Sequence, residues 1–127
     1  MKVLVLGSGG MLGQKFTQVF NEQWETWGTA TGSRELVAHF TGVSAGRIVR
    51  DFDALDGVQL RMVLDQIQPD WVVNAIGLIK QSPLMADLGL ATRLNSDLPR
   101  TLAEACDARG SRLIHLSTDC VFSGAKG

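Results

Sequence analysis

The chain has 127 residues, of which 45% are hydrophobic and 20% are charged, and its formal net charge is -1. This length is enough for one domain with a real core, and the near-neutral charge excludes a polyanion-binding surface, so nucleic acid is not an expected partner. The two cysteines, Cys106 and Cys120, do not have the spacing of a metal-binding or redox motif, so no metal is expected. The apolar run after Lys2 is too short for a signal sequence or a membrane span, which predicts a cytoplasmic protein without membrane partners.

The first half of the chain alternates between strand and helix patterns. Residues 2–6, KVLVL, form an apolar, β-branched run bounded by glycine, as in a strand buried on both faces. The apolar residues between 11 and 20 recur at helical spacing and predict a helix over 11–23. Further along we expect a strand at 24–30, a short helix at 34–40 and a strand at 47–52.

The second half continues the alternation. A helix is predicted over 57–68, with Asp56 as its N-cap and Pro69 after its end, and a buried strand then stops at Asn74. The remaining elements are a helical region over 84–108, interrupted near Pro99 and closed by Gly110, and a last strand at 112–117. This alternation predicts an α/β fold: a Rossmann-type, doubly wound parallel sheet of about five strands in the order 3-2-1-4-5, in three αβα layers.

Glycines follow the first strand directly, at Gly7, Gly9, Gly10 and Gly13. Gly7 permits a tight turn, Gly9 or Gly10 lets a phosphate reach backbone N–H groups at the positive end of the helix, and Gly13 lets helix and strand pack closely. This context predicts dinucleotide binding, in which we include Met11 and Leu12 at the start of the helix; a glycine turn that binds nothing is the alternative.

Four segments together resemble one family. They are "MKVLVLGSGGMLGQ", "PDWVVNAIG", "NSDLPRTLAEAC" and "LIHLSTDCVFSG", which occur over the whole chain in the family's order. They are similar to the extended short-chain dehydrogenase/reductase family and, within it, to the dTDP-4-dehydrorhamnose reductase branch. Gly7, Gly10 and Gly13 also have the GxxGxxG spacing typical of this family.

The resemblance implies roles for residues around the cofactor. Asp53 would bond the adenine amino group, with Ala54 beside it, although a turn-forming aspartate is the alternative. Asn74 is expected to tie neighbouring strands together. The wall beside the ribose and diphosphate would be formed by Ala75, Ile76 and Gly77.

Other residues match the family's later motifs. Asn95 matches an asparagine that supports a water relay in the wider superfamily, and a helix-packing role is equally open. Thr118 matches the catalytic Ser/Thr that would bond the substrate's keto oxygen, with a local cap as the alternative, and Ser117 is placed at the cofactor. Cys120 replaces the usual tyrosine of this segment and is expected to fill apolar space.

The segment after the second strand bears on the choice of cofactor. Its sequence, GTATGSR, has no acidic residue before Glu35, whereas NAD-preferring Rossmann units have one that bonds the ribose 2′-OH. Thr31, Ser33 and Arg34 would instead hold a 2′-phosphate. The alternative for Arg34 is a solvent-exposed surface charge without a ligand. NADP(H) is therefore favoured and NAD(H) stays open.

The family's proton donor is the tyrosine of a Tyr-x-x-x-Lys motif that follows the segment at the end of this chain, and the sequence has no tyrosine. We therefore expect residues 1–127 to be an NAD(P)-binding Rossmann domain, truncated before that motif and the substrate-binding region and inactive alone. In the complete protein it would be the NADP(H)-binding part of a nucleotide-sugar 4-keto reductase. A non-catalytic NAD(P)-binding regulatory module, or an epimerase or dehydratase of the same superfamily, is the alternative.

The last strand of the predicted sheet has no neighbour on its outer side. Because exposed strand edges can pair between chains, a homo-oligomer is also predicted.

Overall fold

Strands and helices alternate along the chain in a computed structural model, which describes residues 1–31, 33–76 and 97–115. The bounds differ from the predicted ones by a few residues at element ends. The elements are β1 (Lys2–Leu6), α1 (Met11–Asn21), β2 (Glu25–Ala30), α2 (Arg34–Thr41), the 3₁₀ helix η1 (Ala45–Arg47), β3 (Ile48–Arg50), α3 (Gly57–Ile67), β4 (Trp71–Asn74), α5 (Leu98–Arg109) and β5 (Arg112–His115).

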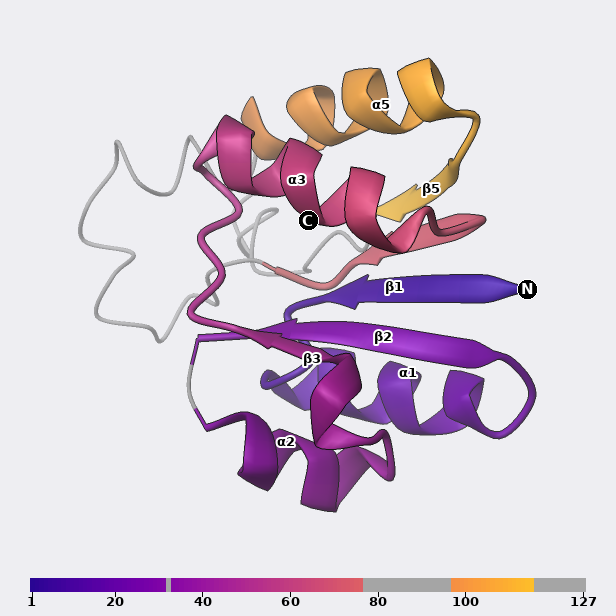
Figure 1. The fold of residues 1–127 in the computed structure, drawn as a ribbon, viewed down its shortest axis with the longest axis vertical. Coiled ribbons are helices and arrows are strands. Elements are labelled where there is room, and N and C mark those ends of the chain that lie inside the picture. Colours follow the sequence, from indigo (N-terminus) through magenta and orange to yellow (C-terminus); the bar gives the residue numbers. More distant parts are fainter. Residues whose placement is uncertain (32, 77–96, 116–127) are drawn as a thin grey trace, which may run out of the picture.

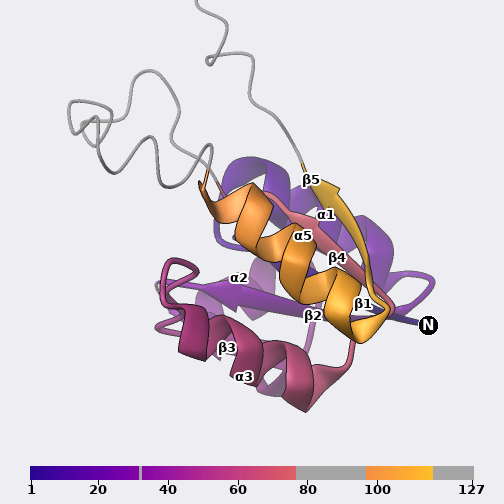
Figure 2. The same cartoon turned by 90° about the horizontal axis from the view of Figure 1, so that it is seen from above.

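The five strands form one parallel sheet in the order β3-β2-β1-β4-β5 (Figure 1). Helices α3 and α5 cover one face of the sheet, and α1 and α2 cover the other (Figures 1 and 2). The predicted Rossmann-type topology and its three layers are therefore confirmed. The order of the strands reverses direction between β1 and β4. In open α/β sheets, ligands bind at the carboxyl ends of the strands on either side of such a switch point.

Alternate residues of the central strand, β1, point to opposite faces of the sheet. Leu4 and Leu6 belong to the core beneath α3 and α5, whereas Val3 and Val5 pack with Val73 beneath the other layer. The α3/α5 core is one continuous apolar cluster, whose buried members are Leu4, Leu6, Phe52, Ala54, Leu60, Val63, Leu64, Ile67, Val72, Leu98, Leu102 and Cys106.

Local signals explain where the elements begin and end. Asp56 caps α3 as predicted, because its Oδ1 accepts from the N–H groups of Val58 and Gln59 at 3.0 and 3.3 Å. β3 is shorter than expected and ends at Arg50, where Asp51 with a φ of 54° interrupts the extended backbone before the Phe52 N–H donates to the Ala30 carbonyl at 3.4 Å.

Pro99 lies in the first turn of α5, where proline's missing N–H costs no helical hydrogen bond. A helix boundary at Leu98 is compatible with the predicted interruption near Pro99. The helix ends at Gly110, which has a φ of 74°, as the sequence predicted. Residues 84–96 of the predicted helical region lie outside the described residues.

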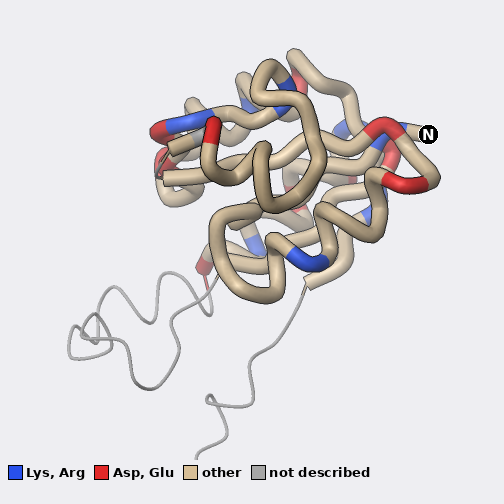
Figure 3. Tube along the Cα trace, turned by 90° about the horizontal axis from the view of Figure 1, so that it is seen from below, with Lys and Arg blue, Asp and Glu red and all other residues tan. Residues whose placement is uncertain are grey.

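Charges of both signs are interspersed along the described chain (Figure 3). Within the described ranges, no helix is long and apolar enough to cross a bilayer, and no three or more His, Cys, Asp or Glu side chains gather as a potential metal site. Cys106 is buried in the α3/α5 core, and this burial raises the pKa of its thiol, which disfavours a reactive thiolate.

Candidate functional site

The segment between β1 and α1 forms a tight loop at the carboxyl edge of the sheet. The Gly7 N–H donates to Thr29 Oγ1 at 3.0 Å, and the Ser8 N–H donates to the Thr29 carbonyl oxygen at 2.8 Å. Gly7 has a φ of 85°, a conformation that glycine adopts without strain, and its carbonyl accepts from the Gly10 N–H at 3.1 Å. The tight turn predicted at Gly7 is thus present, anchored to the end of β2.

Two of the glycines are required by close backbone contacts. A Cβ on Gly13 would overlap the Gly7 carbonyl oxygen and lie 2.7 Å from the Gly7 carbonyl carbon. A Cβ on Gly7 would lie 3.0 Å from Ile76 Cγ1 and 3.3 Å from the Ala75 carbonyl carbon. The close approach predicted for Gly13 is therefore confirmed, and the loop lies directly against the segment after β4.

Gly9 and Gly10 differ from those two because both are exposed and have room around them. A Cβ on Gly9 would meet Val37 Cγ2 at 3.7 Å, and one on Gly10 would meet the Gly7 carbonyl oxygen at 3.6 Å, both ordinary contacts. Packing among the described residues does not require glycine at either position. Their small size keeps the outer surface of the loop open.

The start of α1 is open to an anion. Gly10 is its N-cap and makes no side-chain capping bond, and the first turn contains no acidic residue. The first N–H groups of a helix have no intrahelical acceptor, and the helix dipole makes this end positive. Met11 and Leu12 are 88% and 55% exposed, so this helix end faces solvent. Backbone donors are thus available where the sequence predicts a diphosphate.

Three residues that support the loop were missed by the sequence analysis. Ser8 and Thr17 are fully buried, and their hydroxyl oxygens lie 3.0 Å apart. Ser8 Oγ donates to the Val5 carbonyl at 3.1 Å, and Thr17 Oγ1 lies 2.6 Å from the Gly13 carbonyl oxygen. Gly28 leaves space for Ser8, since a Cβ there would overlap Ser8 Oγ. A glycine inside the β2 pattern was the available signal for this close approach.

The end of β4 brings a second segment to the loop. The Ala75 N–H donates to the Leu6 carbonyl at 3.0 Å, and the Ile76 N–H donates to Asn74 Oδ1 at 3.1 Å. Asn74 Nδ2 lies 3.0 Å from His115 Nδ1, so the side chain of Asn74 links β4 to β5. The prediction that Asn74 ties neighbouring strands is confirmed, and Ala75 and Ile76 stand beside Gly7.

Asp53 forms a turn before α3. Its Oδ1 accepts from the Leu55 N–H at 2.9 Å, and its own N–H donates to Gln59 Oε1 at 3.0 Å. The turn-forming reading of Asp53 is therefore correct. The residue is exposed, and among the described residues its Oδ2 accepts no hydrogen bond, so contact with an adenine amino group stays a prediction.

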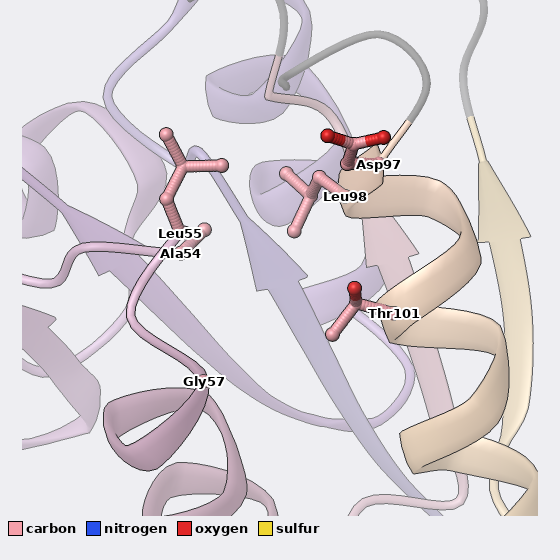
Figure 4. A pocket seen from close by; sticks show the side chains of 6 residues that line it. All are labelled: Ala54, Leu55, Gly57, Asp97, Leu98 and Thr101. Carbon is pink, nitrogen blue, oxygen red and sulfur yellow. The ribbon is translucent and has the colours of Figure 1, made fainter.

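A cavity of about 220 Å³ opens next to this turn. It lies between the segment before α3 and the first turn of α5 (Figure 4). Apolar side chains of Ala54, Leu55 and Leu98 face it together with the polar groups of Asp97 and Thr101. Ala54 was predicted at the site from the sequence, whereas the two polar residues were not, because they join it only through the packing of α5 near α3.

The residues predicted at the 2′-phosphate follow β2. Thr31 is exposed, and Ser33 caps α2, accepting from the Leu36 N–H at 3.2 Å and lying 3.3 Å from Glu35 Oε2. Arg34 begins α2, and its side chain lies outside the described part of the structure. The predicted residues Gly77, Asn95, Ser117 and Thr118 also lie outside the described residues.

Comparison with known proteins agrees with this arrangement. The model of the family described as "RmlD substrate binding domain" matches residues 1–127. A dTDP-4-dehydrorhamnose reductase from Streptomyces griseus is 32% identical over 124 residues, which are 98% of this chain and 35% of that protein. The chain therefore spans about a third of the length of this curated relative.

Solved structures show the same fold. A hypothetical dTDP-4-dehydrorhamnose reductase from Sulfolobus tokodaii has a TM-score of 0.78 and 24% identity, over 100% of this chain and 42% of that one. The UDP-glucose 4-epimerase from Bifidobacterium longum, in complex with NAD+ and UDP, has a TM-score of 0.75 and 20% identity, over 97% of this chain and 38% of that one. Together with the family match over its whole length, the glycine loop and its sheet identify the chain as a member of the RmlD substrate binding domain family.

Proposed function

We propose that this chain is the NADP(H)-binding part of a nucleotide-sugar 4-keto reductase resembling the dTDP-4-dehydrorhamnose reductases. The observation that supports it most is the glycine loop at the switch between β1 and β4. Gly7 and Gly13 are required by backbone contacts, whereas Gly9 leaves an open surface in front of an uncapped, positive helix end. A dinucleotide diphosphate is the ligand that matches this combination.

The residues around the glycine loop fit a bound dinucleotide. The first N–H groups of α1 would hold the diphosphate, and Ala75 and Ile76 would border it on the β4 side. The adenine would lie toward Asp53 and the cavity beside Ala54. When bound, the nicotinamide supplies a hydride to the C4 carbonyl of the sugar.

The substrate side of the reaction involves Thr118 in this proposal. Its hydroxyl would donate a hydrogen bond to the keto oxygen and hold it while the carbonyl is reduced. No tyrosine occurs in this sequence, so the tyrosine proton donor of the family is not among these 127 residues. The activity and the nucleotide-sugar substrate are therefore proposed for the complete protein, and cofactor binding for this chain.

Isothermal titration of the chain with NADPH tests the cofactor site. Gly9→Ala adds a methyl group that the protein can accommodate, with its nearest contact at 3.7 Å, but that would stand where the diphosphate approaches. We expect a loss of affinity of about tenfold or more, equivalent to about 1.4 kcal/mol. Gly46→Ala is the matched control, because Gly46 is exposed in η1 and its added Cβ would lie 3.8 Å from Ser44 Oγ. Equal affinities of both variants, or no heat with wild type, would reject the proposal.

The preference for NADP(H) rests on the segment after β2, which lacks an acidic residue before Glu35. Arg34→Ala is expected to weaken NADPH binding more than NADH binding, because only NADPH has the 2′-phosphate that a guanidinium would hold. Titrations with both cofactors measure the ratio. Equal losses for the two cofactors would remove Arg34 from the phosphate site.

Structural likeness to a UDP-glucose 4-epimerase keeps an epimerase as the second candidate. Reductase and epimerase differ in redox balance, since a reductase oxidises one NADPH per sugar, whereas an epimerase oxidises the C4 hydroxyl and then reduces the ketone again, with no net change in its cofactor. The complete protein is incubated once with NADPH and a nucleotide-linked 4-keto sugar, and once with the oxidised cofactor and a nucleotide-linked 4-hydroxy sugar. Loss of NADPH over many turnovers in the first mixture supports the reductase, inversion at C4 without net change in absorbance in the second supports the epimerase, and a binding module without catalysis would leave both mixtures unchanged.

A further inference from the structure

Hydrogen bonds link the end of β5, through Asn74, to the segment that lies beside the glycine loop. Asn74 and His115 are register partners on β4 and β5, and the Asn74 side chain is fully buried. Asn74 Oδ1 accepts from the Ile76 N–H at 3.1 Å, and Asn74 Nδ2 lies 3.0 Å from His115 Nδ1. The amide of Asn74 thus contacts a backbone donor on one side and an imidazole on the other.

These contacts determine the tautomer of His115. The Ile76 N–H can only donate, so the Asn74 atom that faces it must be the amide oxygen. The amide nitrogen therefore faces the imidazole, and because an amide NH₂ group only donates, His115 Nδ1 must accept. A neutral ring whose Nδ1 accepts has its proton on Nε2.

The same contacts reach the candidate cofactor site. Ile76 lies against Gly7, where an added Cβ would be 3.0 Å from Ile76 Cγ1. The Ala75 N–H donates to the Leu6 carbonyl at 3.0 Å, so this segment continues the pairing of β4 with β1 up to the loop. A change at the His115 ring is thereby transmitted through Asn74 to the wall beside Gly7.

We propose that His115 is a positioning residue of the dinucleotide site. As the Nε2–H tautomer it accepts from Asn74, which orients the amide so that its oxygen holds the Ile76 N–H against the glycine loop. His115 itself is exposed on an edge of the described sheet, so its ring is not needed to fill the core. This inference rests on the proposed dinucleotide binding.

Imidazole ¹H–¹⁵N correlation spectra at about pH 8, where an ordinary histidine is neutral, test the tautomer. His39 on α2 is the only other histidine and serves as the internal reference. We expect the Nε2–H pattern for His115 in wild type. In Asn74→Asp a carboxylate oxygen replaces the amide NH₂ group, so the proton should move to Nδ1. A wild-type Nδ1–H pattern would overturn the proposal.

NADPH titration tests the positioning role. His115→Leu removes the acceptor and is expected to lower affinity about tenfold, because the Asn74 NH₂ group is left buried without its partner. His115→Asn restores an acceptor, because the Oδ1 of asparagine is bonded to Cγ, as Nδ1 is in histidine. This variant should therefore recover most of the affinity. His39→Leu is the matched control and should bind like wild type.

The two proposals fail in different ways. Wild type that binds no dinucleotide would reject the proposed function, whereas tight wild-type binding matched by His115→Leu would reject only the positioning role. Equal weakening in His115→Leu and His115→Asn would also reject it, because a restored acceptor would then have no effect. Urea unfolding of each variant ensures that only folded protein is compared.

Discussion

The two faces of the sheet are built differently. Beneath α3 and α5 the side chains form one continuous apolar cluster. Beneath α1 and α2 the apolar residues divide into two smaller clusters, one around Val3, Val5 and Val73 and the other around Val37 and Ile48. The buried hydroxyl side chains of this second layer are Ser8, Thr17, Thr26 and Thr41.

This difference separates stability from loop geometry. The hydroxyl groups beneath α1 and α2 find acceptors on nearby backbone carbonyls, such as that of Val5 for Ser8 and that of Val37 for Thr41. Gly13 and Gly28 complete the layer by letting backbone and side chains approach closely. The α3/α5 face therefore contributes most of the apolar burial, and the α1/α2 face holds Ser8 and Gly13 of the loop after β1, which Thr29 Oγ1 also anchors by accepting from the Gly7 N–H.

The largest effect is expected at the α3/α5 face. Leu102→Ala removes a fully buried side chain from the continuous cluster and should lower the free energy of unfolding by about 2–5 kcal/mol. Urea unfolding followed by circular dichroism measures the loss. The folded fraction should still bind dinucleotide like wild type, and a specific loss of affinity would contradict the separation of roles between the two faces.

At the α1/α2 face we expect Gly28→Ala to reduce both stability and dinucleotide affinity. The new Cβ would overlap Ser8 Oγ and lie 2.9 Å from Ser8 Cβ, an overpacking that costs about 1–3 kcal/mol. Adding Ser8→Gly removes the obstructing side chain, so the double variant should lose less than the sum of the single variants. Urea unfolding of the four proteins gives this coupling, and strict additivity would show that the contact is unimportant.

The cap of α3 should have a smaller effect. Asp56→Ala removes the acceptor for the Val58 and Gln59 N–H groups and is expected to cost about 1 kcal/mol of unfolding free energy. Asp56→Asn keeps a capping oxygen and is the matched control. Urea midpoints of the two variants make the comparison, and an equal loss in both would assign the effect to charge.

The smallest effect concerns the ion pair between α3 and α5. Arg109 Nε donates to Asp65 Oδ1 at 2.7 Å, and this hydrogen bond lowers the pKa of the Asp65 carboxyl. A lowered folded-state pKa stabilises the fold above the ordinary carboxyl pKa, and this contribution disappears as pH falls through the lowered value. Solvent screening keeps it small, because the Asp65 side chain is 66% exposed.

Urea midpoints of Arg109→Gln between about pH 7 and pH 3 test this ion pair. The deficit relative to wild type should be largest at neutral pH and should shrink as Asp65 is protonated. Arg100→Gln is the control, because Arg100 makes only a 3.8 Å contact with Asp97, the residue directly before α5. A deficit that is constant with pH would assign the role of Arg109 to packing.

Much of the fold and part of the site could be predicted because their signals are local. The apolar run of β1, the cap at Asp56 and the glycines after β1 depend on near neighbours in the chain. Pro99 shows the limit of such signals, because a proline can end one helix or begin the next, and only the structure shows that α5 begins beside it, at Leu98.

By itself, the sequence determined the order of strands and helices, the parallel sheet and the position of the glycine loop, because periodicity and backbone preference act over a few residues. Only the tertiary structure decided that Gly28 faces Ser8, that Asp97 and Thr101 share a cavity with Ala54, and that His115 contacts Asn74. Each of these contacts joins residues at least 20 positions apart, and their distances depend on how strands align and helices pack across the sheet.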